Sequence, residues 1–266
     1  MFDKLLLPID PSKRLRPARN YAIALAKRLD VPLIATYVSN PSKTGTVTAS
    51  TETRRGFEAL GKRQLEQFID ETSDTKIEPI LKTGKRREVL AHMIDEGIAD
   101  TLILGPFRSF ISRLFTGSEV ERILESESSH AFVVRKEYPL PGSGSPALVV
   151  FDGPVLPKEA LEKLENFSRK FKCDLELLHI GTEIFGDAEA MDKAVEQLRN
   201  KLGGDFHVTS TIIPLSYFKS RKTITNSVVE SEGARVVILP DIEEAVSDIL
   251  LHQLVLSASV PVCVLR

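Results

Sequence analysis

Leu5-Leu6-Leu7-Pro8-Ile9-Asp10 is an apolar run that ends in a carboxylate, and Leu148-Val149-Val150-Phe151-Asp152 repeats this pattern in the second half of the chain. Asp10 and Asp152 are 142 positions apart, and so are Tyr37 and His179 in the apolar run that follows each of them. A register held through a strand, a helix and a second strand favours duplication over coincidence. The chain is therefore predicted to contain two copies of one unit, each opening with a buried strand.

Apolar runs alternate with segments of helical periodicity along the first half, which is typical of a parallel sheet covered by helices on both faces. The expected strands are about Lys4–Ile9, Pro32–Val38, Lys76–Leu81, Thr101–Leu104 and Ala131–Arg135. The expected helices are Pro17–Leu29, Arg54–Asp70, Arg87–Glu96 and one that begins near Ser118. The Ser-, Thr- and Gly-containing stretch Ser39–Thr53 is predicted to be a loop.

The second half repeats this order of elements. Its expected strands are about Ala147–Phe151, Asp174–Ile180, His207–Ile213, Arg235–Leu239 and Val260–Leu265. Its expected helices are Pro157–Lys172, Glu189–Leu202, Thr223–Ser231 and Val246–Ser257. We predict an α/β protein of two tandem doubly wound parallel five-stranded sheets related by a pseudo-twofold axis. The predicted domains are 1–136 and 147–266, and the Pro-, Gly- and Ser-rich stretch 137–146 is predicted to be a linker.

The composition is that of a globular protein, with 266 residues, 42% hydrophobic and 27% charged. A formal net charge of −2 gives no electrostatic reason to expect nucleic acid or an anionic membrane as a partner. No apolar run approaches the roughly 20 residues of a membrane span. Cys173 and Cys263 form no CxxC pair, and their predicted burial favours reduced thiols in a cytoplasmic protein.

Ligands of open parallel sheets bind beyond the carboxyl ends of the strands, where the strand order reverses. In the first half these ends carry Asp10, Val38 and Gly105, and Gly117-Ser118 precedes a predicted helix whose free N–H groups suit phosphate. Gly105 and Ser118 each have a second interpretation that does not involve a ligand. Gly105 alternatively makes a tight turn, and Ser118 alternatively caps its helix together with Glu121.

These residues together resemble the universal stress protein family over nearly the whole chain, as a tandem two-domain member with an adenine nucleotide alpha hydrolase-like fold. The resemblance is carried by Leu7-Pro8-Ile9-Asp10, Ala99–Gly105, Gly117-Ser118 and Ala131–Val134. Members that bind ATP have the motif G-x2-G-x9-G-S/T after the fourth strand. The resemblance implies ATP or AMP, with Mg²⁺ if ATP, at a first-half site with Asp10, Val38, Gly105, Gly117 and Ser118. Pro8, Ile9 and Arg108 are added as further candidate residues of this nucleotide site.

The first half departs from this motif at three points. Arg108 replaces the second glycine, one residue is missing before Gly117, and Glu119 follows Ser118. Arg108 has two interpretations, because its side chain either fills the pocket or pairs with phosphate. The apolar and basic loop Pro106–Thr116 either folds onto its own domain or covers the pocket or a partner.

The second half lacks the glycine loop and has Pro240-Asp241-Ile242-Glu243-Glu244 in its place. We expect no nucleotide there, and we expect Asp152 to serve only as a turn or cap residue. The basic cluster Lys82, Lys85, Arg86 and Arg87 is interpreted first as a solvated helix start and second as a contact for phosphate or an anionic partner. The histidines show no metal spacing, and no catalytic set is identified.

Three functions follow from these observations. The first is a non-catalytic stress-response module that binds an adenine nucleotide in its first domain. The alternatives are a slow nucleotide hydrolase, for which Asp10 is the candidate acid, and an interaction protein without a nucleotide site. We expect the strands 131–135 and 261–265 to pair internally as a pseudo-dimer, while a homodimer and unknown protein partners remain open.

Overall fold

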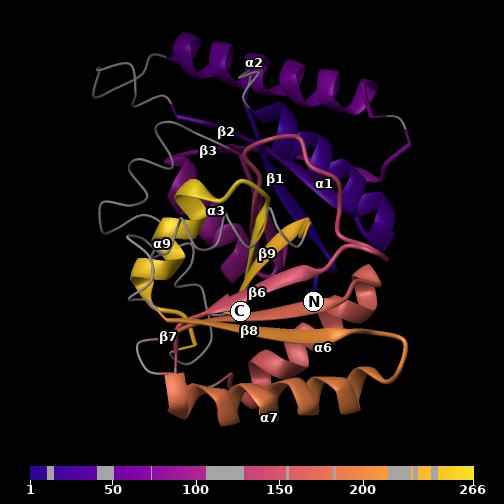
Figure 1. The fold of residues 1–266 in the computed structure, drawn as a ribbon. Helices are drawn as coiled ribbons and strands as arrows, with labels where there is room; N and C mark the ends of the chain where they lie inside the picture. Colours follow the sequence, from indigo (N-terminus) through magenta and orange to yellow (C-terminus); the bar gives the residue numbers. More distant parts are fainter. Residues whose placement is uncertain are drawn as a thin grey trace. The chain divides into compact units, whose positions relative to one another are not determined.

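Strands and helices alternate along the chain, as its apolar periodicity predicts (Figure 1). This computed structural model describes residues 1–10, 15–40, 51–72, 74–105, 129–153, 156–181, 184–214, 229, 233–240 and 245–266. The chain divides into two units, Met1–His130 and Ala131–Arg266. Each unit is described by itself below.

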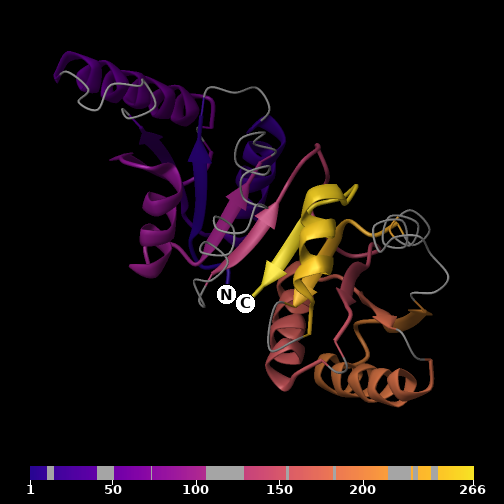
Figure 2. The ribbon, with the colours of Figure 1, turned by 90° about the vertical axis from the view of Figure 1, so that its left-hand side faces the viewer.

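The first unit contains four parallel strands in the order β3-β2-β1-β4. Its elements are β1 Leu5–Ile9, α1 Arg16–Leu29, β2 Leu33–Ser39, α2 Thr51–Asp70, β3 Ile77–Thr83, α3 Arg86–Asp95 and β4 Thr101–Leu104. Right-handed crossovers place α1 and α2 on one face, because the chain moves in the same direction from β1 to β2 and from β2 to β3. The chain then crosses back to β4, so α3 covers the opposite face (Figure 2).

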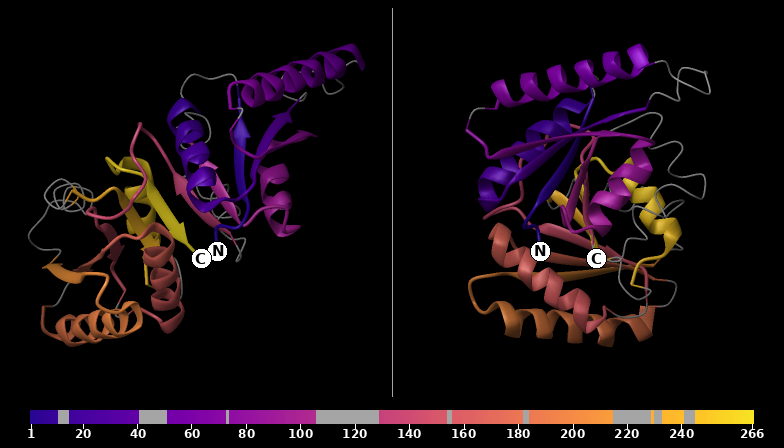
Figure 3. Two further views of the ribbon diagram at one scale, coloured as in Figure 1. Left: turned by 90° about the vertical axis from the view of Figure 1, so that its right-hand side faces the viewer. Right: turned by 180° about the vertical axis from the view of Figure 1, so that it is seen from behind.

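The second unit has the strand order β5-β10-β9-β6-β7-β8. Its elements are β5 His130–Val133, β6 Ala147–Phe151, α6 Lys158–Phe171, β7 Leu175–Gly181, α7 Ile184–Leu202, β8 Val208–Pro214, β9 Val236–Pro240, α9 Asp248–Ser257 and β10 Val262–Leu265. The helices α6 and α7 pack against each other (Figure 3). Among the described residues, the strand pairs of this unit are parallel except for β5 with β10, which is antiparallel.

Each unit has one strand at which the direction of the connections reverses. The strand β1 lies between β2 and β4, and β6 lies between β7 and β9. Ile9 is paired with Tyr37, and Phe151 is paired with His179. The register inferred from the duplicated sequence is therefore confirmed, and Asp10 and Asp152 follow the central strands at equivalent positions.

The predicted α/β class with two similar, mostly parallel halves is confirmed, and so is the pairing of 131–135 with 261–265, since Phe132 is paired with Cys263. This pair is antiparallel, so the strands do not form purely parallel sheets. The division between His130 and Ala131 reflects this pairing, which joins β5 to the second unit. The predicted boundaries at 136 and 147 stay predictions.

Several element ends differ from the sequence prediction. The expected loop Ser39–Thr53 was wrong at both ends, because Ser39 belongs to β2 and Thr51 already belongs to α2. Helix α7 begins at Ile184 rather than at the expected Glu189. The sequence places the start too late because Gly186 interrupts the apolar pattern. The helix expected near Ser118 and most of the one expected over Thr223–Ser231 lie outside the described residues.

Within the described ranges, no helix is long and apolar enough to cross a membrane.

Helix α2 lies close to the sheet at one glycine. A Cβ built on Gly61 would stand 2.6 Å from both Leu81 Cδ1 and Tyr37 Cδ1, whereas a Cβ on Gly56 would meet nothing within 4 Å. Both glycines lie inside α2, so they share the same intrinsic helix propensity. The two positions differ in the space beside them.

We expect Gly56→Ala to stabilise the protein by about 0.5–1 kcal/mol, because alanine is the better helix former. We expect Gly61→Ala to destabilise it by about 1–2 kcal/mol, because overpacking against Leu81 and Tyr37 exceeds the same propensity gain. Urea denaturation followed by circular dichroism measures both variants. Equal effects of the two substitutions would contradict the close packing of α2.

Both cysteines are free and buried. Burial raises the pKa of the Cys263 thiol well above its ordinary value, so the thiol is protonated at neutral pH. We expect the folded protein to react with a thiol reagent such as dithionitrobenzoate only slowly at pH 7, and both thiols to react at once in urea. Rapid labelling of Cys263 in the folded protein would contradict its placement in the β9–β10–β5 ladder.

Candidate functional site

Asp10 stands directly after β1, at the carboxyl edge of the first unit, and meets a side chain from the opposite face of the sheet. Arg86, the first residue of α3, donates from Nη1 to Asp10 Oδ2 at 3.3 Å. The two side chains are 26% and 19% exposed. The switch point of this unit therefore holds a carboxylate and a guanidinium that are both largely withdrawn from water.

Tyr37 lies in the electrostatic field of this pair. Burial raises the pKa of Tyr37, the Asp10 carboxylate raises it further, and the Arg86 guanidinium opposes the shift. Burial also lowers the pKa of Arg86, and Asp10 counteracts that effect. An arginine stays protonated in proteins, so these groups form a charged pair beside a neutral phenol at pH 7.

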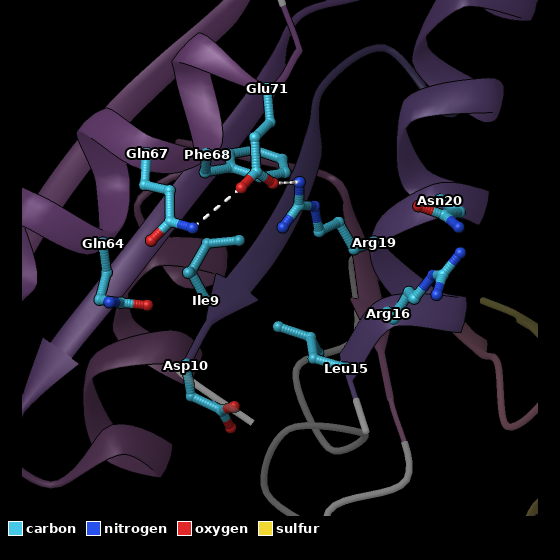
Figure 4. Close-up of a pocket in the computed structure, with 10 residues that line it drawn as sticks. All are labelled: Ile9, Asp10, Leu15, Arg16, Arg19, Asn20, Gln64, Gln67, Phe68 and Glu71. Carbon is cyan, nitrogen blue, oxygen red and sulfur yellow. Dashed lines mark hydrogen bonds and ion pairs between the residues drawn. The ribbon is translucent and has the colours of Figure 1, made fainter. Parts of the chain in front are cut away.

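A cavity of about 620 Å³ opens beside Asp10, between α1 and α2 (Figure 4). Ile9 and Asp10 contribute from β1 and its end, Leu15 and Arg16 from the start of α1, and Gln64 from α2. The remaining lining residues are Arg19, Asn20, Gln67, Phe68 and Glu71. The lining combines amides, both signs of charge and a few apolar side chains, so this cavity suits a polar ligand.

Arg19 crosses from α1 towards α2 in this cavity (Figure 4). Its Nη2 donates to Glu71 Oε2, and its guanidinium lies 4.9 Å from the centre of the Phe68 ring. The hydrogen bond from Arg19, followed by one from Gln67, holds the pKa of Glu71 below its ordinary value. Glu71 is therefore ionised at neutral pH, and the ion pair connects the two helices.

Gly105 follows β4 at the same edge, and α1 accounts for the absence of a side chain there. A Cβ at this position would lie 3.0 Å from Leu15 Cδ1 and 3.3 Å from Ala18 Cβ. The start of α1 therefore packs against Gly105. This packing is a reason for the glycine that the sequence did not indicate, and both earlier interpretations, a tight turn and close approach to a ligand, stay predictions.

The other predicted site residues divide into two groups. Pro8 and Ile9 lie in β1, and Val38 lies in β2 and is paired with Lys82 of β3. These residues share the carboxyl half of their strands with Asp10. Arg108, Gly117 and Ser118 lie outside the described residues, as does the loop Pro106–Thr116.

In the second unit, the equivalent carboxylate binds the start of a helix. Asp152 Oδ1 accepts from the Ser247 backbone N–H at 2.7 Å, and Asp152 Oδ2 accepts from Ser247 Oγ at 2.5 Å. Ser247 is the N-cap of α9 and accepts from the Leu250 N–H. The expectation that Asp152 is a cap residue is confirmed, and its charge is favourable at a helix N-terminus.

A serine, an aspartate and a histidine meet at this edge without forming a catalytic relay. His179 Nε2 lies 2.9 Å from the Gly153 carbonyl oxygen, while the Ser247 hydroxyl donates to Asp152. A relay requires the histidine between the serine and the aspartate, which is a different order. In the parts of the chain that the structure describes, no group of three or more His, Cys, Asp or Glu residues could hold a metal ion.

The basic cluster Lys82, Lys85, Arg86 and Arg87 was interpreted first as a solvated helix start. This interpretation was wrong for Arg86, which is mostly buried against Asp10. It holds for Lys85, which is 71% exposed and pairs with Glu88. Both residues belong to one run of cations, and only the direction of each side chain from the start of α3 separates them.

Sequence reasoning also missed the cavity between α1 and α2. Its signal lies in the duplication, because the position 142 residues after Arg19 is Leu161, which is buried and lines a cavity of about 550 Å³ between α6 and α7. A cation that replaces a buried leucine in one copy marks a difference in chemistry between the two units.

We expect Asp152→Ala and Ser247→Ala each to destabilise the second unit by about 1–2 kcal/mol, because each removes capping bonds from α9. The double variant is expected to lose clearly less than the sum of the two, since both act through one contact. Thermal and urea unfolding measure the free energy of unfolding of each variant. Asp205→Ala, at an exposed residue, is the control and is expected to change this free energy little. Additive losses would mean that Asp152 does not act through Ser247.

A search of curated protein sequences finds no match. Among solved structures, a universal stress protein from Archaeoglobus fulgidus is 17% identical with a TM-score of 0.71, and the match covers 100% of this chain and 98% of that one. A putative universal stress protein from Pseudomonas aeruginosa is 11% identical with a TM-score of 0.61, covering 99% and 93%. These matches show the fold alone. The model of the universal stress protein family matches residues 1–135, and the chain belongs to that family.

Proposed function

We propose that the first unit binds an adenine nucleotide, ATP or AMP, at its carboxyl edge, and that the protein is a non-catalytic stress-response module. The observation that carries this proposal is the position of Asp10 after the central strand β1, where the connections reverse direction. Open parallel sheets bind ligands at that point. Family membership supports the ligand class, and the buried thiols support a reducing compartment such as the cytoplasm.

The described residues fit the base of such a nucleotide. Asp10 supplies a carboxylate acceptor suited to an exocyclic amine, and Arg86 supplies a donor beside it. Val38, only partly buried, contributes an apolar surface from β2. The residues proposed for the phosphates and for Mg²⁺, Gly117 and Ser118 with their neighbours, lie in the undescribed segment. They enter this proposal through the sequence motif.

At the equivalent edge of the second unit, the aspartate is bound by a residue of its own chain. Its carboxylate already occupies the N-terminus of α9, where an anionic ligand would bind. We therefore propose that one nucleotide binds per chain. The bond between Asp10 and Arg86 gives no support to the hydrolase alternative, because a catalytic base needs a carboxylate directed at water or substrate.

Isothermal titration calorimetry with ATP and AMP tests this proposal. We expect saturable binding with a stoichiometry of about one nucleotide per chain. We also expect denaturation of the purified protein to release the same nucleotide, which mass spectrometry identifies. Asp10→Ala is expected to weaken binding about 10- to 100-fold, because a hydrogen bond to a charged group is lost. Gly117→Val is expected to abolish binding.

Asp74→Ala serves as the matched control, since Asp74 is 84% exposed in the same unit. It is expected to leave the affinity unchanged. Absence of any binding at millimolar nucleotide would favour the interaction protein without a nucleotide site. Hydrolysis of ATP above a protein-free control, lost in Asp10→Ala, would favour the hydrolase.

A further inference from the structure

The cavity between α1 and α2 has an equivalent in the second unit, and the two differ in their lining. Their volumes are about 620 Å³ and about 550 Å³, both within the range of small-molecule sites. Arg16 and Arg19 line the first cavity, and the positions 142 residues later, Lys158 and Leu161, line the second. Both cavities thus have a cation at one of these positions, and only the first has a cation at the other.

Packing between the two helices does not account for Arg19. In the second unit, the equivalent Leu161 is buried between α6 and α7. The Nε atom of Arg19 is buried and has no hydrogen-bond partner among the described residues. A buried donor without a partner is unfavourable, so a leucine would serve the helix contact better. The arginine is therefore better explained by what it offers to the cavity.

The guanidinium of Arg19 is held in one orientation. Its Nη2 donates to Glu71 Oε2, and the group lies 4.9 Å from the centre of the Phe68 ring. Gln67 Nε2 donates to the other oxygen of Glu71 at 2.9 Å. Arg19 Nη1 makes no hydrogen bond with the described residues and is turned away from Glu71, on the side of the cavity that Ile9 lines (Figure 4). A donor that is held in advance loses little freedom when a ligand binds.

Two amides of α2 face the same space. Gln64 and Gln67 are three residues apart, so they lie on one side of the helix (Figure 4). The Gln64 side chain makes no hydrogen bond within the described parts of the chain, and its amide offers both donors and an acceptor. The Gln67 nitrogen is used by Glu71, which leaves the Gln67 oxygen as an acceptor. A hydroxyl group both donates and accepts, so it matches this mixture.

The charges of the lining favour a ligand without net charge. The charged lining residues are two arginines, Arg16 and Arg19, and two carboxylates, Asp10 and Glu71. An anion that binds Arg19 Nη1 would also lie near the Glu71 carboxylate, and a cation near Glu71 would lie near Arg19. A neutral molecule avoids both repulsions.

We propose that this cavity is a second ligand site, for a neutral polyhydroxylated molecule of the size of a monosaccharide or disaccharide. Arg19 Nη1 and the amides of Gln64 and Gln67 bind its hydroxyl groups. These three residues belong to α1 and α2 and are distinct from the residues proposed for the nucleotide. The inference therefore does not rest on nucleotide binding.

Saturation-transfer difference NMR of the full chain tests this proposal. The probes are glucose, ribose, myo-inositol and trehalose, with gluconate and glucose 6-phosphate as charged counterparts of glucose. We expect at least one neutral probe to bind saturably with a dissociation constant of about 10 mM or lower. Absence of binding by all four neutral probes, or tighter binding of the charged ones, would overturn the proposal.

Arg19→Leu is the direct variant, because it gives the first cavity the residue that the second unit has. We expect the probe to bind about tenfold or more weakly, since a hydrogen bond to a charged group is lost. Lys27→Leu is the matched control, because Lys27 belongs to the same helix and pairs with the exposed Asp74, outside the lining of the cavity. Its affinity is expected to stay within about threefold of wild type. Equal losses in the two variants would contradict a contact with Arg19.

Gln64→Ala separates binding from stability. The Gln64 side chain makes no hydrogen bond with the described residues, and alanine is a good helix former, so the midpoint of a thermal melt is expected not to fall. The affinity for the probe is expected to drop about three- to tenfold, because a neutral hydrogen bond is lost. An unchanged affinity would reject the site, and this variant decides the question if Arg19→Leu does not fold.

The two proposals fail in distinguishable ways. The probe is expected to bind at saturating AMP, and Arg19→Leu is expected to bind AMP within about threefold of wild type. If the protein binds a neutral probe but no AMP, only the nucleotide site is rejected. If it binds AMP but no neutral probe, only the second site is rejected. A parallel loss of AMP and probe in Arg19→Leu would make the cavity part of the nucleotide site and would overturn the second site.

Discussion

A carboxylate that is largely withdrawn from water must find a partner, and this constraint organises the functional edge of both units. The strands β1 and β6 end in Asp10 and Asp152, next to the place where the strand connections reverse. Ionised groups are rarely buried without a charge or hydrogen-bond partner, because desolvation costs several kcal/mol. Arg86 is a partner in the first unit, and Ser247, the N-cap residue of α9, is a partner in the second.

The two aspartates are bound by different groups. Asp152 accepts from the backbone N–H and the hydroxyl of Ser247, the N-cap residue of α9. The Asp10 contact comes from Arg86 at the start of α3, and the Asp10 carboxylate adds to the effect of burial in raising the pKa of Tyr37. The same aspartate serves as a candidate ligand contact in one unit and as a structural cap in the other.

Packing around the first site also depends on small residues. Gly61 lets α2 approach Tyr37 and Leu81, and Gly105 lets the start of α1 approach the end of β4. These contacts position both walls of the cavity beside Asp10. Arg19 and Glu71 then connect the walls where the second unit has the buried Leu161. Cavities of similar volume thus lie between the paired helices of both units, and Arg19 with Glu71 makes the lining of the first one different.

Apolar periodicity and the repeat of 142 positions were sufficient to predict the α/β class, the duplicated parallel sheets and the position of Asp10, because these follow from local patterns and from register. Helix ends were predicted less well, since Thr51 and Gly186 fall in stretches without a clear apolar pattern. The partner of each aspartate was decided by the tertiary structure. Arg86 is 76 residues from Asp10, and Ser247 is 95 residues from Asp152. Contacts over such separations depend on which strands are neighbours and on which face a helix packs, and no local pattern in the sequence encodes the direction of a single side chain at that edge.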